Sequence, residues 1–250
     1  MRVDLNCDLG EIAGSNNDEA LMSVISSANI ACGYHAGNNE TMEITVRLAI
    51  KYGVKIGAHP GYRDRKNFGR MPVRTTRREL RDLIISQVET LAEITGRHGQ
   101  RLQHVKPHGA LYNSASSDYE MSLAIAESVK ELDPSLILVG LSGSELINAA
   151  KATGIPCASE VFADRAYNDD GTLVSRSVPG SVLHDTGMVI SRAAGMIRNR
   201  SVESINGKII PVEPDTICIH GDNAMAPVFA RDLASAFREE GIIISPMKGR

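Results

Sequence analysis

The sequence contains no long apolar run, no paired cysteine motif and no large excess of either charge. No apolar run approaches the roughly 20 residues that a membrane-spanning helix needs, and the N-terminal MRVDLNCDLG lacks the basic and then apolar layout of a signal peptide. The cysteines are scattered without a CxxC pair, which argues against a disulfide framework and predicts buried thiols in a reducing compartment. They are Cys7, Cys32, Cys157 and Cys218. We therefore expect a cytoplasmic protein without a membrane segment.

The charge balance is close to neutral, with 27 basic and 30 acidic residues and a net charge of −3. Proteins that bind nucleic acids or anionic membranes over a broad surface are usually basic, so we expect neither as a partner. Residues 63–81 depart from this balance, because they contain many arginines and few acids. This segment fits a solvated helix start, and around Arg70 it fits equally well a phosphate clamp or a docking face for another subunit.

Several catalytic motifs are missing from the chain. There is no GxSxG nucleophile elbow and no GxxxxGK[ST] loop with which the chain could use ATP by itself. The HExxH zinc motif is also missing, so the ligands of a metal ion would have to come from separate strands. We assign no metal ligand from the sequence and leave the presence of a metal open.

Short apolar runs of strand length alternate with longer amphipathic stretches along the 250 residues. The runs cover residues 2–7, 27–33, 54–58, 102–107, 136–141, 156–162, 216–220 and 242–245. The capping box that begins a helix fits at three places, which are Thr76 with Glu79, Ser117 with Glu120, and Ser142 with Glu145. Strand followed by helix, repeated about seven times, predicts parallel strands joined by right-handed crossovers.

Both an open doubly wound sheet and a closed barrel fit this alternation, and the strand ends favour the barrel. Reactive polar residues follow nearly every apolar run, as in a (β/α) barrel, where chemistry gathers at the carboxyl ends of many strands. An open sheet concentrates function in one crevice. We predict an α/β fold, a barrel of seven or eight parallel strands formed by residues 1–250 as a single domain. Residues 165–186 do not follow the alternation of apolar runs and amphipathic stretches, so we expect a loop or hairpin insertion there.

Alternate residues of the runs place polar side chains on one face of a strand. These rows are Asp4, Asn6 and Asp8; His104, Lys106 and His108; Glu160 and Asp164; and His220 and Asp222. Both faces of the strands in a parallel barrel are covered, so the rows should point into the lumen or toward its mouth. Buried charges are paired or functional, which favours an active site over satisfied polar plugs. His35 and His59, near Gly or Pro at strand ends, are further candidates.

Longer motifs resemble one known family. They are DLNCDLGE (4–11), SANIACGYHAG (27–37), GAHPGY (57–62), NFGR (67–70), HVKPHGALYN (104–113), EVFADRAY (160–167) and HGD (220–222). In content and order they closely resemble the LamB/YcsF family, whose members are A subunits of prokaryotic 5-oxoprolinase. The resemblance implies a distorted (β/α) barrel similar to the glycoside hydrolase/deacetylase group. It also implies ATP-dependent opening of 5-oxoproline to L-glutamate, in a complex with subunits B and C.

One residue departs from the family's pattern. The Asp that usually follows HAG is Asn38 in this chain. If that carboxylate were a metal ligand or a base, the chain would be impaired. Asn38 precedes a predicted helix, however, and Asn caps a helix as well as Asp does.

The implied reaction suggests a division of labour. A lactam carbonyl is a poor electrophile, and phosphorylation of its oxygen by the partner subunits, with ATP as co-substrate of the complex, would activate it. This chain would then bind the activated lactam and deliver water. The catalytic candidates are Asp8, His35, His59, Lys106, His108, Glu160 and His220. The candidates for binding substrate or phosphate are Asn6, Arg70, Asp164, Arg165 and Asp222.

Within this set the roles are only partly separable. A carboxylate, Asp8 or Glu160, is expected to act as general base on water. His35 or His59 would assist it, and His108 or His220 would protonate the leaving nitrogen. The cationic residues Lys106, Arg165 and Arg70 would neutralise the phosphate and the substrate carboxylate.

Two alternatives from other classes stay open. A metal-dependent amide or sugar hydrolase working alone would hold stoichiometric metal, lose activity with chelators and need no ATP. A non-catalytic subunit would bind a lactam without any effect of strand-end mutations on its partners' turnover.

Overall fold

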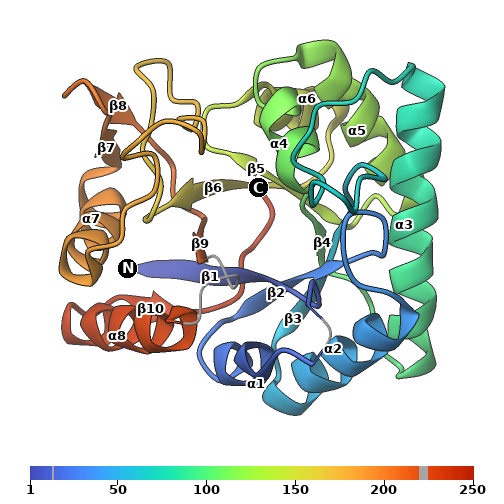
Figure 1. Ribbon diagram of the computed structural model, residues 1–250, viewed down its shortest axis with the longest axis horizontal. Helices are drawn as coiled ribbons and strands as arrows, with labels where there is room; N and C mark the ends of the chain where they lie inside the picture. Colours follow the sequence, from blue (N-terminus) through green and yellow to red (C-terminus); the bar gives the residue numbers. More distant parts are fainter. Residues whose placement is uncertain (13, 220–224) are drawn as a thin grey trace.

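Seven parallel strands close into a barrel in the computed structural model, which describes residues 1–12, 14–219 and 225–250 (Figure 1). In spatial order they are β1 (Arg2–Leu9), β2 (Ser27–Ala31), β3 (Lys55–His59), β4 (His104–Val105), β5 (Ile137–Leu141), β6 (Cys157–Phe162) and β9 (Thr216–Ile219). The ring closes because β9 pairs with β1 as well as with β6. A further strand, β10 (Ile243–Ile244), pairs in parallel with the start of β1. The predicted barrel of seven or eight parallel strands is confirmed.

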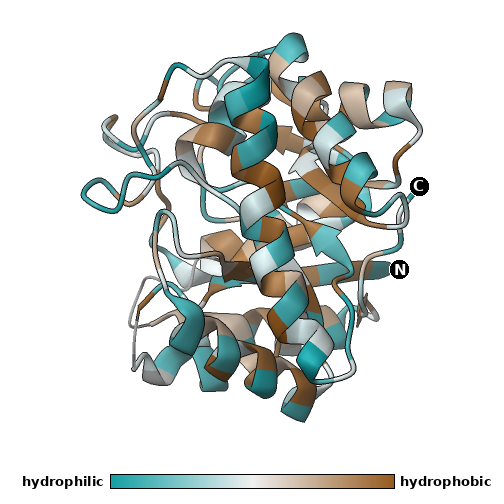
Figure 2. Cartoon of the chain, turned by 90° about the vertical axis from the view of Figure 1, so that its right-hand side faces the viewer, coloured by the Kyte–Doolittle hydropathy of each residue, from teal (hydrophilic) through white to brown (hydrophobic). Residues whose placement is uncertain are grey.

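Helices surround this barrel. They are α1 (Asn16–Met22), α2 (Asn39–Tyr52), α3 (Arg77–Arg97), α4 (Gly109–Ala115), α5 (Tyr119–Leu132), α6 (Glu145–Thr153), α7 (Thr186–Asn199) and α8 (Ala226–Glu239). Neighbours contact one another in the order α7, α8, α1, α2, α3, α5 and α6. Figure 2 faces α3, along which hydrophilic and hydrophobic residues alternate, as expected of a helix with one face on the barrel and one in solvent.

Of the three capping boxes predicted from the sequence, one is formed. Thr76 and Glu79 form the predicted capping box of α3. The other two predicted boxes are wrong, because the N-caps are Asp118 for α5 and Ser144 for α6. Asn38 caps α2, where its side chain accepts a hydrogen bond from the backbone of Thr41, so its interpretation as a capping residue is confirmed.

Two features interrupt the strand and helix alternation. Residues 163–185 contain no helix and are tied by isolated antiparallel bridges between Arg165 and Val182 and between Tyr167 and Leu173. A hairpin of β7 (Ser201–Glu203) and β8 (Ile209–Pro211) follows α7. The sequence analysis missed this hairpin, although the Asn-Gly pair at its turn is a strong hairpin signal.

The C-terminal segment covers the amino-terminal end of the barrel. Ser245 donates a backbone hydrogen bond to Val3, and the backbones of Arg250 and Cys157 exchange two. Met247 is buried in a small cluster with Ile137 and other side chains of β5 and β6. The lumen is therefore covered at this end, and the strands' carboxyl ends face the opposite one.

All four cysteines are buried free thiols, as predicted. Among the described residues, no helix combines the length and the apolar character needed to cross a bilayer.

Gly57 has no side chain, and this leaves room in the lumen for the imidazole of His104. Gly57 pairs with His104 across β3 and β4, and a Cβ at Gly57 would lie 2.0 Å from His104 Nε2. His104 is fully buried and hydrogen-bonds to the Asn29 side chain at 2.8 Å. Burial, and then the nearby Lys106 charge, lowers the pKa of His104 to about 3, so it is a neutral core residue.

We expect Gly57→Ala to lower the free energy of unfolding by about 1–3 kcal/mol, because the new methyl overlaps a buried ring. Urea unfolding followed by circular dichroism measures the change. The matched control is Gly96→Ala in α3, where a Cβ meets nothing within 4 Å and stability should rise by up to about 1 kcal/mol. Equal stability of the two variants would contradict the close approach of His104 to residue 57.

Candidate active site

Polar side chains from several strands form one hydrogen-bonded network in the lumen. On β1, Asn6 donates to the Glu160 carboxylate at 3.0 Å and to the Thr216 hydroxyl at 2.6 Å. On β2, Asn29 donates to Asn6 at 2.7 Å and to Asp8 at 2.8 Å. Asn6 and Asp8 of β1 and Glu160 of β6 therefore point inward, as predicted for their rows, and the network joins β1, β2, β6 and β9.

Lys106 lies at the centre of this network, directly after β4. Its Nζ is 2.9 Å from Asp8 Oδ1 and 2.8 Å from Glu160 Oε1. Burial alone would lower the pKa of Lys106, but the negative charges around it, that of Asp8 foremost, raise this pKa well above its ordinary value. Lys106 is therefore a charged ammonium that compensates two carboxylates in the lumen.

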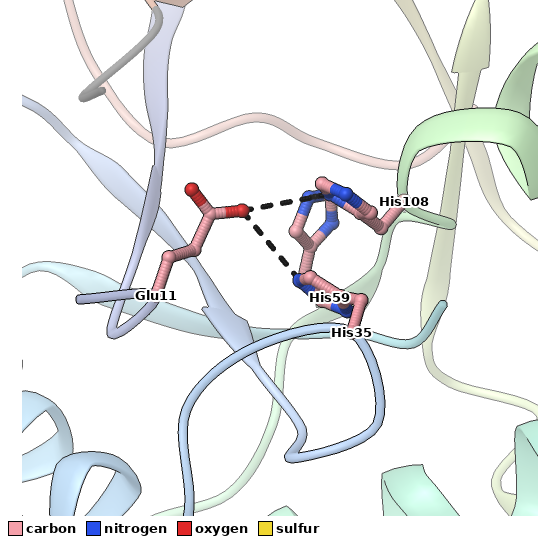
Figure 3. Close-up of side chains that lie close together, drawn as sticks. All are labelled: Glu11, His35, His59 and His108. Carbon is pink, nitrogen blue, oxygen red and sulfur yellow. Dashed lines mark hydrogen bonds and ion pairs between the residues drawn. The ribbon is translucent and has the colours of Figure 1, made fainter. Parts of the chain in front are cut away.

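Three imidazoles and one carboxylate converge at the carboxyl ends of the strands (Figure 3). Glu11 follows β1, His35 follows β2, His59 ends β3 and His108 precedes α4. One nitrogen or oxygen of each side chain lies within 4.8 Å of those of the others. Glu11 Oε1 is 3.5 Å from both His35 Nε2 and His108 Nδ1.

The loop after β3 is shaped to let two of these rings stack. The centroids of His35 and His108 are 3.7 Å apart, and the rings are nearly parallel. Gly69 covers them with a left-handed φ of +65°, and a Cβ there would lie 2.8 Å from the Cβ of His35. Only glycine combines this backbone conformation with this close approach.

Hydrogen bonding limits the protonation of His59 and His108. His59 Nδ1 lies 2.7 Å from the Lys106 carbonyl oxygen, and His108 Nε2 lies 2.9 Å from that of Phe68. Carbonyl oxygens only accept, so both nitrogens carry a proton. The remaining nitrogens, His59 Nε2 and His108 Nδ1, face each other at 2.9 Å. Two neutral rings would direct two lone pairs at each other, so this contact needs a third proton or another cation.

The same four residues fit a divalent metal ion. Both ring nitrogens of His35 are buried and accept or donate no hydrogen bond among the described residues. Burial, and then the charge of His59, lowers the pKa of His35 to about 3, and burial also lowers the pKa of His108. Neutral imidazoles beside a carboxylate are the donors that zinc and similar ions prefer, so Glu11, His35, His59 and His108 could hold one.

A cavity of about 480 Å³ opens beside this cluster, within the range of small-molecule sites. Its charged and titratable lining residues are Asp8, Glu11, His59, Arg70, Lys106, His108, Tyr112, Arg165 and Arg176. The arginines come from the loop after β3 and from residues 163–185. Acidic and imidazole groups thus share one cavity with several cations, an arrangement suited to binding an anionic ligand and moving protons on it.

The structure brings most of the predicted residues to this cavity. Asp8, His59, Lys106, His108, Arg70 and Arg165 line it. Asn6 and Glu160 lie in the lumen network, where both are fully buried. His35 stacks on His108, and Asp164 is half-buried beside Arg165, outside the lining. His220 and Asp222 lie outside the described residues.

Three functional candidates escaped the sequence analysis. Glu11 follows β1 and stands within a motif quoted for the family, so an acid just beyond a strand end was the available signal. Tyr112 lines the cavity from α4, and burial, followed by the Glu160 charge, raises its pKa well above the ordinary value. Arg176 is an exposed lining residue, and no sequence signal distinguished it from other surface arginines.

Comparisons with known proteins agree with this description. A family model described as the LamB/YcsF family matches residues 3–250. The crystal structure of a lactam utilization protein from Thermus thermophilus is similar with 39% identity and a TM-score of 0.91, over 98% of this chain and 99% of that one.

More distant structures share the fold alone. A family 4 carbohydrate esterase from Streptomyces lividans is 11% identical with a TM-score of 0.52, over 99% of this chain and 93% of that one. A protein from Enterococcus faecalis assigned to cellobiose-phosphate cleavage is 12% identical with a TM-score of 0.55, over 98% and 96%. The expected likeness to deacetylase and glycoside hydrolase barrels is confirmed at the level of fold.

We expect the chelator-treated chain to bind one Zn²⁺ at the Glu11 and histidine cluster. Glu11→Gln and His35→Asn each remove a ligand, so each should weaken binding at least about tenfold. Calorimetric titration with zinc, together with metal analysis of the dialysed protein, measures this. His98→Asn, at the C-terminal end of α3, is the control and should bind as the unmodified chain does. Unchanged binding by both ligand variants would exclude this cluster as the site.

We expect Lys106→Met to lower the free energy of unfolding by about 3–5 kcal/mol, because it leaves two carboxylates without their buried cation. Chemical denaturation measures the loss. Lys151→Met on the exposed surface of α6 is the control and should change stability by less than about 0.5 kcal/mol. Adding Glu160→Gln to Lys106→Met should restore part of the stability, and a further loss would argue against the ion pair.

Proposed function

The chain belongs to the LamB/YcsF family, and from this premise we propose that it is the lactam-opening subunit of an ATP-dependent 5-oxoprolinase. It converts 5-oxoproline to L-glutamate together with subunits B and C. The observation that carries the proposal is the cavity in which Asp8, His59 and Lys106 meet arginine side chains, in a chain whose 39% identical relative is a lactam utilization protein.

The proposed chemistry overcomes the poor reactivity of an amide. The partner subunits transfer the γ-phosphoryl group of ATP to the lactam oxygen, which makes the carbonyl carbon more electrophilic. Water adds to this carbon, the carbon–nitrogen bond breaks as the nitrogen takes a proton, and a second water releases phosphate. The overall reaction consumes one ATP and two waters. The four buried free thiols suit the cytoplasm, where ATP and these partners would be met.

The geometry supports different roles for Asp8 and Glu160, which the sequence left as alternatives. Asp8 lines the cavity, whereas Glu160 is fully buried outside its lining, so Asp8 is the better placed general base. Asp8 Oδ1 is held by Lys106, and Oδ2 lies 3.3 Å from His59 Nε2. The carboxylate is therefore oriented by a cation on one side and an imidazole on the other, as a base that accepts a proton from water requires.

Three other residues complete the proposed mechanism. His108 lines the same cavity and can deliver to the leaving nitrogen the proton that Asp8 takes from water. That proton would pass through His59, whose Nε2 lies 3.3 Å from Asp8 Oδ2 and 2.9 Å from His108 Nδ1. The Lys106 ammonium neutralises negative charge of the phosphoryl group on the lactam oxygen. Phe68 fixes His108 through its carbonyl oxygen, so the imidazole is held before substrate enters.

A second candidate function is metal-dependent hydrolysis without ATP. The convergence of Glu11, His35, His59 and His108 favours it. A metal held there would supply a Lewis acid and lower the pKa of its bound water. The residues of this chain would keep their places, with Asp8 beside the cluster and the arginines binding the anionic part of the substrate.

Glutamate release from 5-oxoproline distinguishes the two functions. We expect release only when this chain, subunits B and C, and ATP are all present. Release by this chain alone, without ATP and abolished by a chelator, would establish the metal-dependent hydrolase instead. No release in either setting would overturn both.

In the active complex, Asp8→Asn should lower kcat roughly 10²- to 10⁴-fold, because the amide cannot accept a proton from water. Steady-state glutamate release measures the change. Asp118→Asn is the matched control, since Asp118 caps α5 and Asn caps as well as Asp. Turnover of Asp8→Asn within threefold of the unmodified complex would remove Asp8 from the role of base.

A further inference from the structure

We propose that Arg165 is the carboxylate-binding residue of the cavity, so that the site selects lactams bearing a carboxylate over simple lactams. This inference rests on the proposed function and assigns one group of the substrate to one side chain.

The Arg165 guanidinium is a buried cation that has no ion pair among the described residues. It is 5% exposed and lines the cavity. Its Nη2 donates to the Val174 carbonyl at 2.7 Å and its Nε to the Ser181 carbonyl at 3.3 Å. Within the part of the chain that the structure describes, no carboxylate oxygen lies within 4.0 Å of it, and its Nη1 has no acceptor.

Lys106, the other buried cation of the site, differs from Arg165 in its partners. Lys106 has two carboxylates within 3 Å, whereas the described partners of Arg165 are neutral carbonyl oxygens. Buried charges in proteins are normally paired. Burial lowers the pKa of Arg165 to about 10, and the charge of Arg176 acts in the same direction. The guanidinium stays charged at neutral pH. An anion in the cavity would offset the free-energy cost of burying that charge.

The shape of the guanidinium favours a carboxylate. A guanidinium presents its donors in a planar fork that matches the two oxygens of a carboxylate. Arg70 and Arg176 also line the cavity, but both are exposed, so water screens their charges. The enclosed position of Arg165 suits a small, planar, singly charged group.

The backbone around Arg165 is fixed without a ligand. Its carbonyl oxygen accepts a hydrogen bond from Arg192 of α7 at 2.8 Å, and its backbone bridges to Val182. The two carbonyls that hold the guanidinium belong to the same segment, residues 163–185. The side chain is therefore already oriented before ligand binding, which reduces the entropy lost on binding.

Calorimetric binding to the complete chain tests the inference with two ligands that differ only in the carboxylate, 5-oxoproline and 2-pyrrolidinone. Arg165→Gln should weaken 5-oxoproline binding at least tenfold and change 2-pyrrolidinone binding less than threefold. Arg165→Lys keeps the charge but loses the planar fork of donors, so its affinity for 5-oxoproline should lie between those of Arg165→Gln and the unmodified chain. Arg198→Gln, on the exposed side of α7, is the control and should match the unmodified chain.

The outcomes separate this inference from the proposed function. Equal 5-oxoproline affinity in Arg165→Gln and the unmodified chain would overturn the inference and leave the function standing. Equal loss of both ligands would show a structural role and also overturn it. Binding of neither lactam by the unmodified chain would overturn the inference, and glutamate release by the complete complex would decide the proposed function separately. If Arg165→Gln does not fold, the unmodified chain still decides: the neutral amide of 5-oxoproline should bind at least tenfold more weakly than the acid.

Discussion

The contact between the Lys106 ammonium and two carboxylates holds the interior of this barrel together. Parallel barrels usually fill their lumen with branched apolar side chains. Here Asp8 and Glu160 pair with a single cation, and Asn6 and Asn29 hydrogen-bond to these carboxylates. An interior of this kind is stable only when every charge has its partner, because the low dielectric magnifies both the attraction within a pair and the cost of a missing partner. The same constraint fixes Asp8 next to His59, so the packing of the lumen and the chemistry at its mouth share one set of contacts.

Much of the architecture was predictable because it depends on local patterns. Short apolar runs marked the barrel strands, since covered strands must be apolar on at least one face. Polar residues at alternate positions of β1 predicted an inward-facing row, and the network from Asn6 to Glu160 is that row. The hairpin of β7 and β8 was missed because its strands are only three residues each, too short for alternation to show.

The functional groups were harder to predict because their meeting depends on the closure of the barrel. Asp8 and Lys106 are far apart in the sequence and touch only across the lumen. Glu11 gave no periodic signal, because it lies in a loop, and its relation to His108 follows from the path of that loop. The sequence could nominate Asp8 and Glu160 equally, and only burial distinguishes the one that lines the cavity from the one that does not.

The C-terminal segment covers one end of the barrel and so limits where ligands can enter and leave. With Met247 packed beneath β5 and β6, ligands exchange through the side where the histidines lie. In the proposed function, reactant and product would use this opening, and a phosphoryl donor on another subunit would reach the substrate through it as well. A partner subunit of the kind proposed would therefore have to leave the barrel opening in each turnover, or carry its own passage for the small molecules.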